Sequence, residues 1–393
     1  MSQTQIQLEL NKRKITLVGT AHVSKESVEE VKNTIAQIKP DCVAVELDEK
    51  RAETIKNPSR YSQLDLVKVL KNHEGFLLLA NLILSSFQRR MGLNAGVKPG
   101  DEMVAAMNAA NENGIRCTLV DRPIQVTLKR AWGKNTFWGK CKLLATLFSS
   151  AFSKEQIQPD EIEKLKVSSE MDSMMNELAE YMPVIKTVLI DERDRYLASK
   201  IWESSGNNIV AVLGAGHLPG VQAYLEKLAS GAVSADTKEI AQVPPKSVAG
   251  KIIVWAIPVI IIGLLIWGFI SGGKDAGITN IWTWIIWNGA LAAIGALLAG
   301  ANPVTILAAF ATAPLTSLCP LVGVGFVTGI IQAVVSKPKV SDMETLQDDV
   351  NSLRGFYKNR ILKVLLVFIL SSLGSSIGTF VGGANILNDI LNY

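Results

Sequence analysis

Over its first 214 residues the chain alternates short apolar runs with longer amphipathic stretches. Four runs are rich in Val, Leu and Ile, and three of them are almost continuously apolar. Such runs are typical of strands buried on both faces of a parallel sheet. They cover residues 14–19, 42–47, 115–120 and 208–214. Helical patterns lie between them, at residues 24–38, 99–113 and 188–203. This order predicts an α/β domain built on a parallel sheet with right-handed crossovers.

Two further segments of the first 250 residues are apolar without being strand-like. Residues 76–87 are too few to cross a membrane and indicate a buried or surface-seeking helix. Residues 137–152 include Lys140 and Lys142 and predict a helix with two open interpretations. It packs as an ordinary helix of the domain, or it lies against a membrane domain or a lipid surface.

Beyond residue 250 the hydrophobic runs become much longer. Residues 252–270, 281–299 and 364–382 contain no charged side chain, and each is long enough to span a hydrocarbon core of roughly 30 Å as a helix. Residues 303–335 are also uncharged, but they are too long for one helix and contain Pro314 and Pro320. We therefore expect a broken hairpin there, either re-entrant or made of two tight spans.

Charge is distributed unevenly along the chain. Of 40 Lys and Arg and 36 Asp and Glu, only 8 basic and 6 acidic residues follow residue 250. This predicts a soluble domain at residues 1–230, a linker at 231–250 and a transmembrane domain at 251–393. Basic residues precede the first span and recur within residues 336–363. The positive-inside rule therefore places the soluble domain in the cytoplasm. The net charge of +4 is too small to indicate nucleic-acid binding.

The expected spans contain no ionisable side chain, and small residues recur along them. The first observation argues against an ion-coupled transporter, and the second favours close helix packing and homo-oligomers formed through the membrane domain. The four cysteines form no C-x-x-C pair, and Cys42 and Cys117 lie in strand-like runs, so we expect buried thiols in a reducing compartment. The first 14 residues lack the apolar core of a signal peptide.

Ionisable residues follow every predicted strand. His22 follows the first, Glu46, Asp48 and Arg51 the second, Asp121 and Arg122 the third, and His217 the fourth. Because the carboxyl ends of parallel strands meet at one edge of a sheet, these groups are expected to converge there. His22 and His217 share the pattern strand, then Gly-x-x-His. Two imidazoles and a carboxylate form a typical divalent-metal set with an open position for water.

Two more residues have a functional and a structural interpretation. Arg193 lies in the charged run Asp191–Arg195, which is either a solvated ion-pair network or a source of an anion-binding side chain. Glu102 begins a predicted helix, where it either complements the helix dipole or projects toward the site. The candidate catalytic residues are therefore Glu46, Arg193 and Glu102, and the candidate metal ligands are His22, His217, Glu46 and Asp121.

An ordered set of short motifs resembles the TraB family, which includes the pheromone-shutdown proteins and is related to GumN-like and Tiki proteins. The motifs are Gly19-Thr-Ala-His22, Val45-Glu-Leu-Asp48 followed by Arg51, Lys98-Pro-Gly-Asp-Glu-Met103, Asp121-Arg-Pro123, Glu192-Arg-Asp194 and Gly214-Ala-Gly-His217. The resemblance covers nearly the whole chain, since the prokaryotic branch carries a C-terminal membrane domain.

The resemblance implies a multi-pass protein of a prokaryotic cell membrane with metal-dependent peptidase chemistry. His22, His217 and Glu46 would bind a divalent ion (Mn, Co or Zn), with Arg193 in support, and the substrate would be a peptide. Two alternatives remain open at the sequence level. One is a protein that binds and sequesters a signal peptide or small ligand without cleaving it, and the other is a membrane scaffold with a vestigial enzyme fold.

Overall fold

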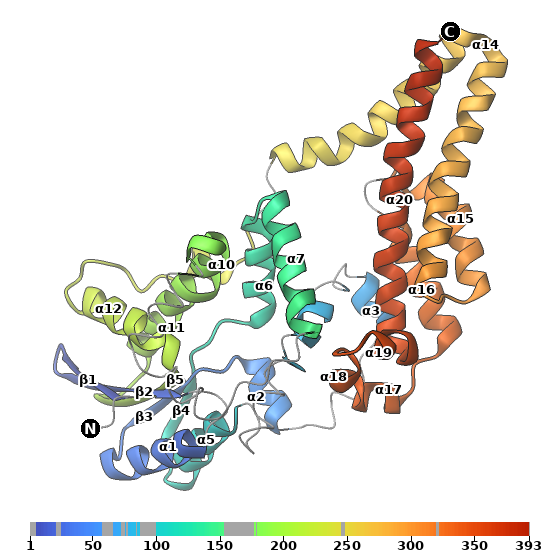
Figure 1. Ribbon diagram of the computed structural model, residues 1–393. Helices are drawn as coiled ribbons and strands as arrows, with labels where there is room; N and C mark the ends of the chain where they lie inside the picture. Colours follow the sequence, from blue (N-terminus) through green and yellow to red (C-terminus); the bar gives the residue numbers. More distant parts are fainter. Residues whose placement is uncertain are drawn as a thin grey trace. The chain divides into compact units, whose positions relative to one another are not determined.

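The computed structural model describes most of the chain. The described residues are 5–20, 25–56, 66–71, 75, 78–83, 85–86, 100–152, 177, 179–244, 248–319 and 322–392. They divide into two compact units, drawn together in Figure 1. The first comprises Met1–Tyr61 and Phe87–Pro244, and the second comprises Ser62–Ser86 and Pro245–Tyr393. The second unit thus includes a segment that the expected boundaries assigned to the soluble domain.

A five-stranded sheet forms the centre of the first unit, in the order β1-β2-β5-β3-β4. The strands are β1 (Gln5–Leu10), β2 (Arg13–Thr20), β3 (Cys42–Val45), β4 (Arg116–Leu119) and β5 (Asn208–Gly214). The four strands predicted from apolar runs are confirmed and run parallel, with Thr20 opposite Gly214 at their carboxyl ends. The sheet itself is mixed, because β1 pairs antiparallel with β2.

The purely parallel sheet was therefore a wrong prediction at one edge. In β1 the apolar residues Ile6, Leu8 and Leu10 alternate with polar ones, a pattern that suits an edge strand with one solvated face. The expected burial of Cys117 was also wrong. It lies in β4 at the other edge of the sheet and is exposed, whereas Cys42 in β3 is buried.

Helices cover both faces of the sheet, because alternate strand residues point to opposite sides. On one face, α11 (Glu192–Glu203) and α12 (Leu218–Ala229) pack their Leu197 and Val221 onto Ala44 and Ala211. On the other face, α1 (Lys25–Ile38) and α5 (Asp101–Glu112) pack on Val43 and Val45. This arrangement leaves the carboxyl ends of β2, β3, β4 and β5 at one edge of the sheet.

Shorter helices complete the first unit. They are α2 (Glu49–Lys56), α6 (Ile124–Lys134), α7 (Phe137–Phe152), α10 (Pro183–Lys186), the π-helical turn η2 (Thr187–Asp191), the 3-10 turn η3 (Ala215–His217) and α13 (Lys238–Ala241). The helices predicted at 99–113, 137–152 and 188–203 are confirmed, although the last begins as the π-helical turn. α6 and α7 run side by side in Figure 1.

In the described residues of the second unit, all regular secondary structure is helical. It contains α3 (Leu66–Lys71), α14 (Val248–Leu298), α15 (Pro303–Thr316), α16 (Val324–Ser336), α17 (Val340–Glu344), α18 (Leu346–Asp349), α19 (Leu353–Lys358) and α20 (Arg360–Leu391). Gly273 has a positive φ of 76°, so α14 consists of two helical arms rather than one straight helix. Gly268 lies against Asn280 and Phe269 against Gly277, so the two arms fold back on each other.

Residues 303–335, where a broken hairpin was expected, contain two short apolar helices, α15 and α16. α15 continues through Pro314 and ends at Thr316, so Pro314 does not make the break. At about 1.5 Å per residue the 14 residues of α15 extend about 21 Å, less than the thickness of a hydrocarbon core. Trp284 donates a hydrogen bond to the Pro314 carbonyl at 3.1 Å, which fixes how far the hairpin reaches along α14.

The long helices meet through glycines. α20 packs along the second arm of α14 because Gly295, Gly374 and Gly378 let the two backbones approach closely. Tyr357 donates a hydrogen bond to the Leu298 carbonyl at 2.9 Å at one end of the pair. At the other end, Ile386 packs with Trp284. α14 (from Trp255) and α20 are two helices long and apolar enough to cross a membrane.

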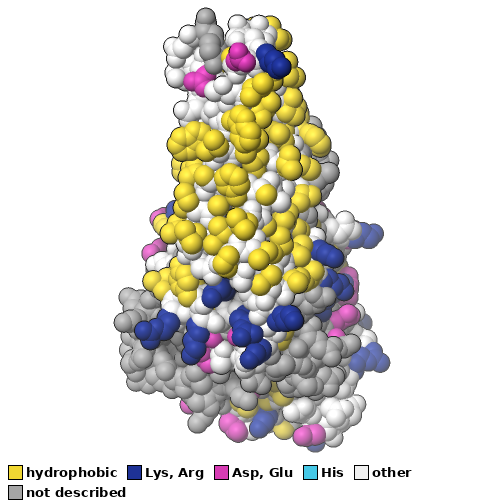
Figure 2. Space-filling view, turned by 90° about the vertical axis from the view of Figure 1, so that its right-hand side faces the viewer, with side chains coloured by type: hydrophobic (Ala, Val, Ile, Leu, Met, Phe, Trp, Pro, Cys, Tyr) yellow, Lys and Arg dark blue, Asp and Glu magenta, His cyan; other side chains and the backbone are white. Residues whose placement is uncertain are grey.

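The surface of the second unit is strongly apolar. Figure 2 shows hydrophobic side chains gathered along its length, with Lys and Arg concentrated beyond one end and a few charged groups at the other. Large side chains that are more than half exposed include Trp255, Val259, Trp267, Ile270, Trp282, Leu297, Leu307, Leu315 and Phe380. An apolar surface of this extent is unusual for a soluble monomer and marks an interaction surface.

Close glycine packing gives a first testable prediction. A Cβ at Gly295 would overlap the Leu370 carbonyl oxygen, whereas a Cβ at Gly263, also in α14, meets nothing within 4 Å. We expect Gly295→Ala to lower the melting temperature of the detergent-solubilised chain, since overpacking costs about 1–3 kcal/mol. Gly263→Ala is the matched control. Equal melting temperatures for the two variants would contradict the close helix contact.

Candidate functional site

Glu46 occupies the centre of the sheet edge. It directly follows β3 and is only 3% exposed. Its Oε2 accepts a hydrogen bond of 2.6 Å from the Gly214 amide at the end of β5. Its Oε1 accepts one of 2.6 Å from Arg193 Nη2. The carboxylate is therefore held in one orientation by the neighbouring strand and by a cation.

Arg193 links Glu46 to the end of the next strand. From α11 its guanidinium donates to both oxygens of Asp121, at 3.2 and 2.8 Å, as well as to Glu46. Burial opposes the charge of Arg193, but Asp121 and Glu46 more than offset this and raise its pKa. The guanidinium stays charged. Arg193 thus points toward the sheet edge and forms an ion-pair network there, and its predicted catalytic role stays a prediction.

His217 lies on the other side of Glu46. Its Nε2 is 3.7 Å from Glu46 Oε1, and its Nδ1 is 2.6 Å from Asp194 Oδ1. Burial raises the pKa of Asp194, and the His217 imidazole partly offsets that rise. With Asp194 ionised, Nδ1 donates its proton to that carboxylate, which leaves Nε2 facing Glu46. The result is an Asp194–His217 pair aimed at the Glu46 carboxylate.

The position of Asp194 depends on a glycine in α12. A Cβ at Gly220 would overlap the Asp194 carboxylate, whereas one at Gly133 in α6 would make only an ordinary contact, 3.7 Å from Pro244. We expect Gly220→Ala to displace Asp194 from His217 and to destabilise the domain by about 1–3 kcal/mol. Gly133→Ala is the control and should be neutral or slightly stabilising. Thermal unfolding of both variants tests this prediction. A Gly220→Ala variant with the melting temperature of the unaltered protein would contradict the contact between Gly220 and Asp194.

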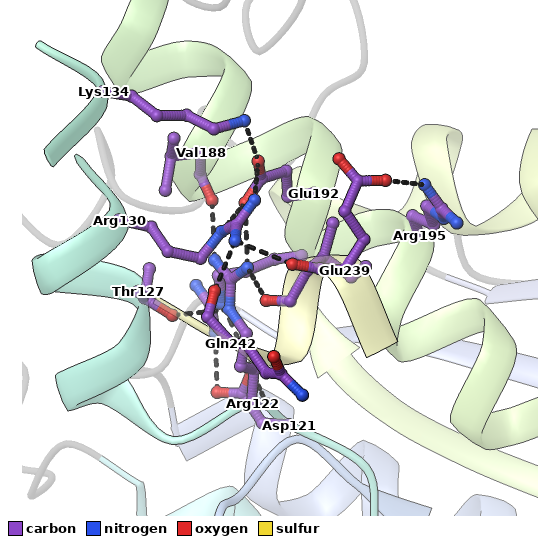
Figure 3. Close-up of polar contacts among 12 residues, drawn as sticks. Asp121, Arg122, Thr127, Arg130, Lys134, Val188, Glu192, Arg195, Glu239 and Gln242 are labelled. Atoms are coloured by element: carbon purple, nitrogen blue, oxygen red, sulfur yellow. Dashed lines mark hydrogen bonds and ion pairs between the residues drawn. The ribbon is translucent and has the colours of Figure 1, made fainter. Parts of the chain in front are cut away.

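A second, largely buried cluster lies beside the site (Figure 3). Arg122 and Arg130 are 0% and 2% exposed and both donate to Glu192, at 2.9 and 2.7 Å. Lys134 adds a third donor to the same carboxylate at 2.7 Å. Burial alone would raise the pKa of Glu192, but hydrogen bonds from Arg130, Lys134 and Arg122 lower it to about 2. Burial lowers the pKa of Arg122.

This cluster also holds the segment expected to be a linker. Arg122 donates to the Ile240 carbonyl at 2.8 Å, and Arg130 donates to the carbonyls of Glu239 and Gln242. Ile240 is buried, and α13 lies within residues 231–250. The chain is therefore fixed to the first unit up to Gln242, and the segment between the units is short.

Not every predicted site residue can be placed. The structure brings together Glu46, Asp121, Arg193 and His217, whereas His22 lies outside the described residues. Glu102 is fully buried in the first turn of α5, and its predicted catalytic role stays a prediction. Sequence reasoning missed Asp194 as the partner of His217. Its place in the Glu192-Arg-Asp194 motif was the available signal, although that motif does not indicate the contact with His217.

The donor chemistry fits a divalent ion in part. Ion–ligand distances of about 2.0–2.2 Å would let one ion contact both His217 Nε2 and Glu46 Oε1 across their 3.7 Å separation. A carboxylate on the second imidazole nitrogen, as Asp194 provides, is the usual support of a metal-binding histidine. Among the residues that the structure describes, no group of three or more His, Cys, Asp or Glu side chains gathers to hold a metal.

Comparison with known proteins agrees with the motif pattern. The profile of the TraB/PrgY/gumN family matches residues 6–234, and that of the TraB family C-terminal domain matches residues 249–391. An uncharacterised protein of Methanocaldococcus jannaschii is 35% identical over 379 residues, which cover 94% of each chain. TraB domain-containing proteins of Bos taurus and Homo sapiens are each 28% identical, over 67% of this chain and 74% of theirs.

The two profile matches follow each other along the chain with a gap of only 14 residues, which covers the end of the first unit and the start of α14. The first of them includes all four residues that meet at the sheet edge. The chain belongs to the TraB/PrgY/gumN family.

Proposed function

We propose that the first unit is a metal-dependent hydrolase that acts on peptide bonds. The observation that carries the proposal is the arrangement of Asp194, His217 and Glu46, with Arg193 beside them. His217 and Glu46, together with His22 of the other Gly-x-x-His motif, would hold a Mn, Co or Zn ion. When bound, such an ion polarises a carbonyl group and lowers the pKa of a water molecule.

The chain's own residues have distinct tasks in this proposal. Glu46, held by the Gly214 amide, accepts a proton from the attacking water. Asp194 fixes the tautomer of His217 and keeps Nε2 directed at the site. Arg193 supplies a permanent positive charge next to the reacting carbonyl, where it can stabilise developing negative charge. Asp121, which contacts Arg193 through both oxygens, positions that guanidinium.

We further propose that the second unit anchors this domain in a membrane as a multi-pass bundle. Support comes from the exposed apolar band, the two long apolar helices and the short α15–α16 hairpin. In this arrangement the arms of α14 and α20 cross the bilayer, and the hairpin enters and leaves on one side. The basic segment between α16 and α20 then faces the cytoplasm, together with the first unit.

The test of the hydrolase is peptide cleavage. Full-length protein in detergent is supplied with Mn, Co or Zn and incubated with a mixture of peptides, and the products are identified by mass spectrometry. We expect cleavage by the unaltered protein and none by His217→Ala. Glu203→Gln changes an exposed carboxylate on the same helix as Arg193 and should cleave normally.

Two other results would refute the proposal in different ways. Cleavage that persists in His217→Ala would show that the reaction takes place elsewhere. Peptide binding without cleavage under every metal would instead favour the alternative, a protein that sequesters a signal peptide or small ligand.

A further inference from the structure

We propose that α6 and α7 present a docking surface for the headgroup region of an anionic lipid bilayer. The surface consists of Trp132, Trp138, Lys140, Lys142 and Tyr181. The inference rests on the proposed membrane anchorage of the second unit and extends it. It assigns to the α/β unit its own contact with the lipid.

Charge is the first argument. Residues 123–152 contain five basic residues and no Asp or Glu. Arg130 and Lys134 pair with Glu192 inside the unit, whereas Lys140 and Lys142 of α7 have no such partner among the described residues and provide positive charge on its surface. Within the described part of the chain, their contacts are with aromatic rings and a carbonyl oxygen, not with carboxylates. Each such lysine gains about 1 kcal/mol near an anionic leaflet.

The aromatic side chains supply the second argument. Trp138 is 79% exposed and Tyr181 is 53% exposed, unusual values for large rings. The Lys142 ammonium lies 3.3 Å from the centre of the Tyr181 ring, and that of Lys140 lies 5.4 Å from the Trp132 ring. Trp and Tyr beside lysines are the side chains that settle at the boundary between lipid headgroups and acyl chains.

The packing of α7 leaves Trp138 exposed on its outward side. Leu143 packs inward on Ala131 of α6 and on Ile185 and Val188, so the inner side of α7 is occupied. Trp138 and Lys142 are four residues apart and lie on one stripe of the helix, away from Leu143. Ala145 and Ser149 continue that stripe and are exposed. The outward stripe therefore begins with a tryptophan and a lysine and contains no acidic group.

The chain connection provides the third argument. Arg130 of α6 binds the carbonyls of Glu239 and Gln242, and Pro244 lies against Gly133 of the same helix. Only three residues separate Pro244 from Val248, where α14 begins. That connection extends at most about 14 Å. If α14 enters the bilayer at Trp255, where its apolar span begins, this tether keeps α6 close to the lipid surface.

Lipid quenching of a label tests the proposal. The full-length chain is made without its native cysteines, carries a fluorescent label at Trp138→Cys and is placed in lipid nanodiscs with a headgroup-level quencher. We expect strong quenching with about 30% anionic lipid, little with phosphatidylcholine alone, and loss of quenching in high salt. Each lysine contributes about 1 kcal/mol to docking, so in Lys140→Gln/Lys142→Gln the ratio of docked to undocked protein should fall about 30-fold.

The control changes the same charge at exposed lysines of α1 and α12, as Lys32→Gln/Lys227→Gln, and should quench normally. Alkaline extraction of membranes separates the possible failures. If the protein is extracted, the membrane anchorage and the docking surface both fail. Two results overturn only the docking surface, with the protein still in the membrane. In one, the label is not quenched. In the other, it is quenched equally with and without anionic lipid and with and without the two lysines.

Discussion

Glu192→Gln is expected to destabilise the first unit by about 3–5 kcal/mol, because it leaves buried arginines without their counter-charge. The substitution keeps the size of the side chain but removes the charge shared by Arg122, Arg130 and Lys134. Both arginines are almost completely buried, so water cannot replace the lost carboxylate. Hydrogen exchange of peptides from α6 and α11 measures the change in local opening free energy.

The control for Glu192 is Glu203→Gln in the same helix, where the carboxylate is exposed and pairs with Lys200. We expect it to stay within about 0.5 kcal/mol of the unaltered protein. Similar exchange in both variants would show that the buried cluster contributes little to stability.

The low pKa of Glu192 adds a dependence on pH. Its folded-state pKa of about 2 lies below the ordinary value of 4.5, so the carboxylate stabilises the fold at and above pH 4.5. This contribution falls as the pH drops from 4.5 toward 2. The stability difference between the unaltered protein and Glu192→Gln should therefore shrink over that range. A constant difference would contradict the ion cluster.

Glu46→Gln is expected to lower the peptidase activity strongly. If Glu46 accepts the proton of the attacking water, replacing its carboxylate with an amide should lower kcat/KM for peptide cleavage by about 10²–10⁴-fold. Asp194→Asn acts only through the orientation of His217, so a smaller loss, about 10–100-fold, is expected. Rates of product formation by mass spectrometry compare the variants. Equal losses would contradict the separate roles assigned to the two carboxylates.

Much of the first unit could be predicted because its strands are buried on both faces. The apolar runs that become β2, β3 and β5 have no polar face, so hydrophobicity alone located them. β1 was not predicted because it is an edge strand in which only Ile6, Leu8 and Leu10 are apolar. Its period of two was the available signal.

The site was predicted only where the strand order determined it. Glu46, Asp121 and His217 lie within three residues of the ends of parallel strands, so their convergence follows from the sheet. Asp194 lies in a helix, and its contact with His217 depends on the approach of α11 to Gly220, which no spacing in the sequence encodes. The packing of Leu70 with Ala333 and Val364 in the second unit could not be predicted either, because no spacing in the sequence encodes it.

The metal content of the purified chain is the most direct test of the proposed function. Full-length protein in detergent is loaded with Mn, Co or Zn, desalted and analysed by mass spectrometry of the elements. We predict about one tightly bound ion per chain, its loss in His217→Ala and its retention in Glu203→Gln. An equal metal content in His217→Ala and the unaltered protein would contradict the proposed site.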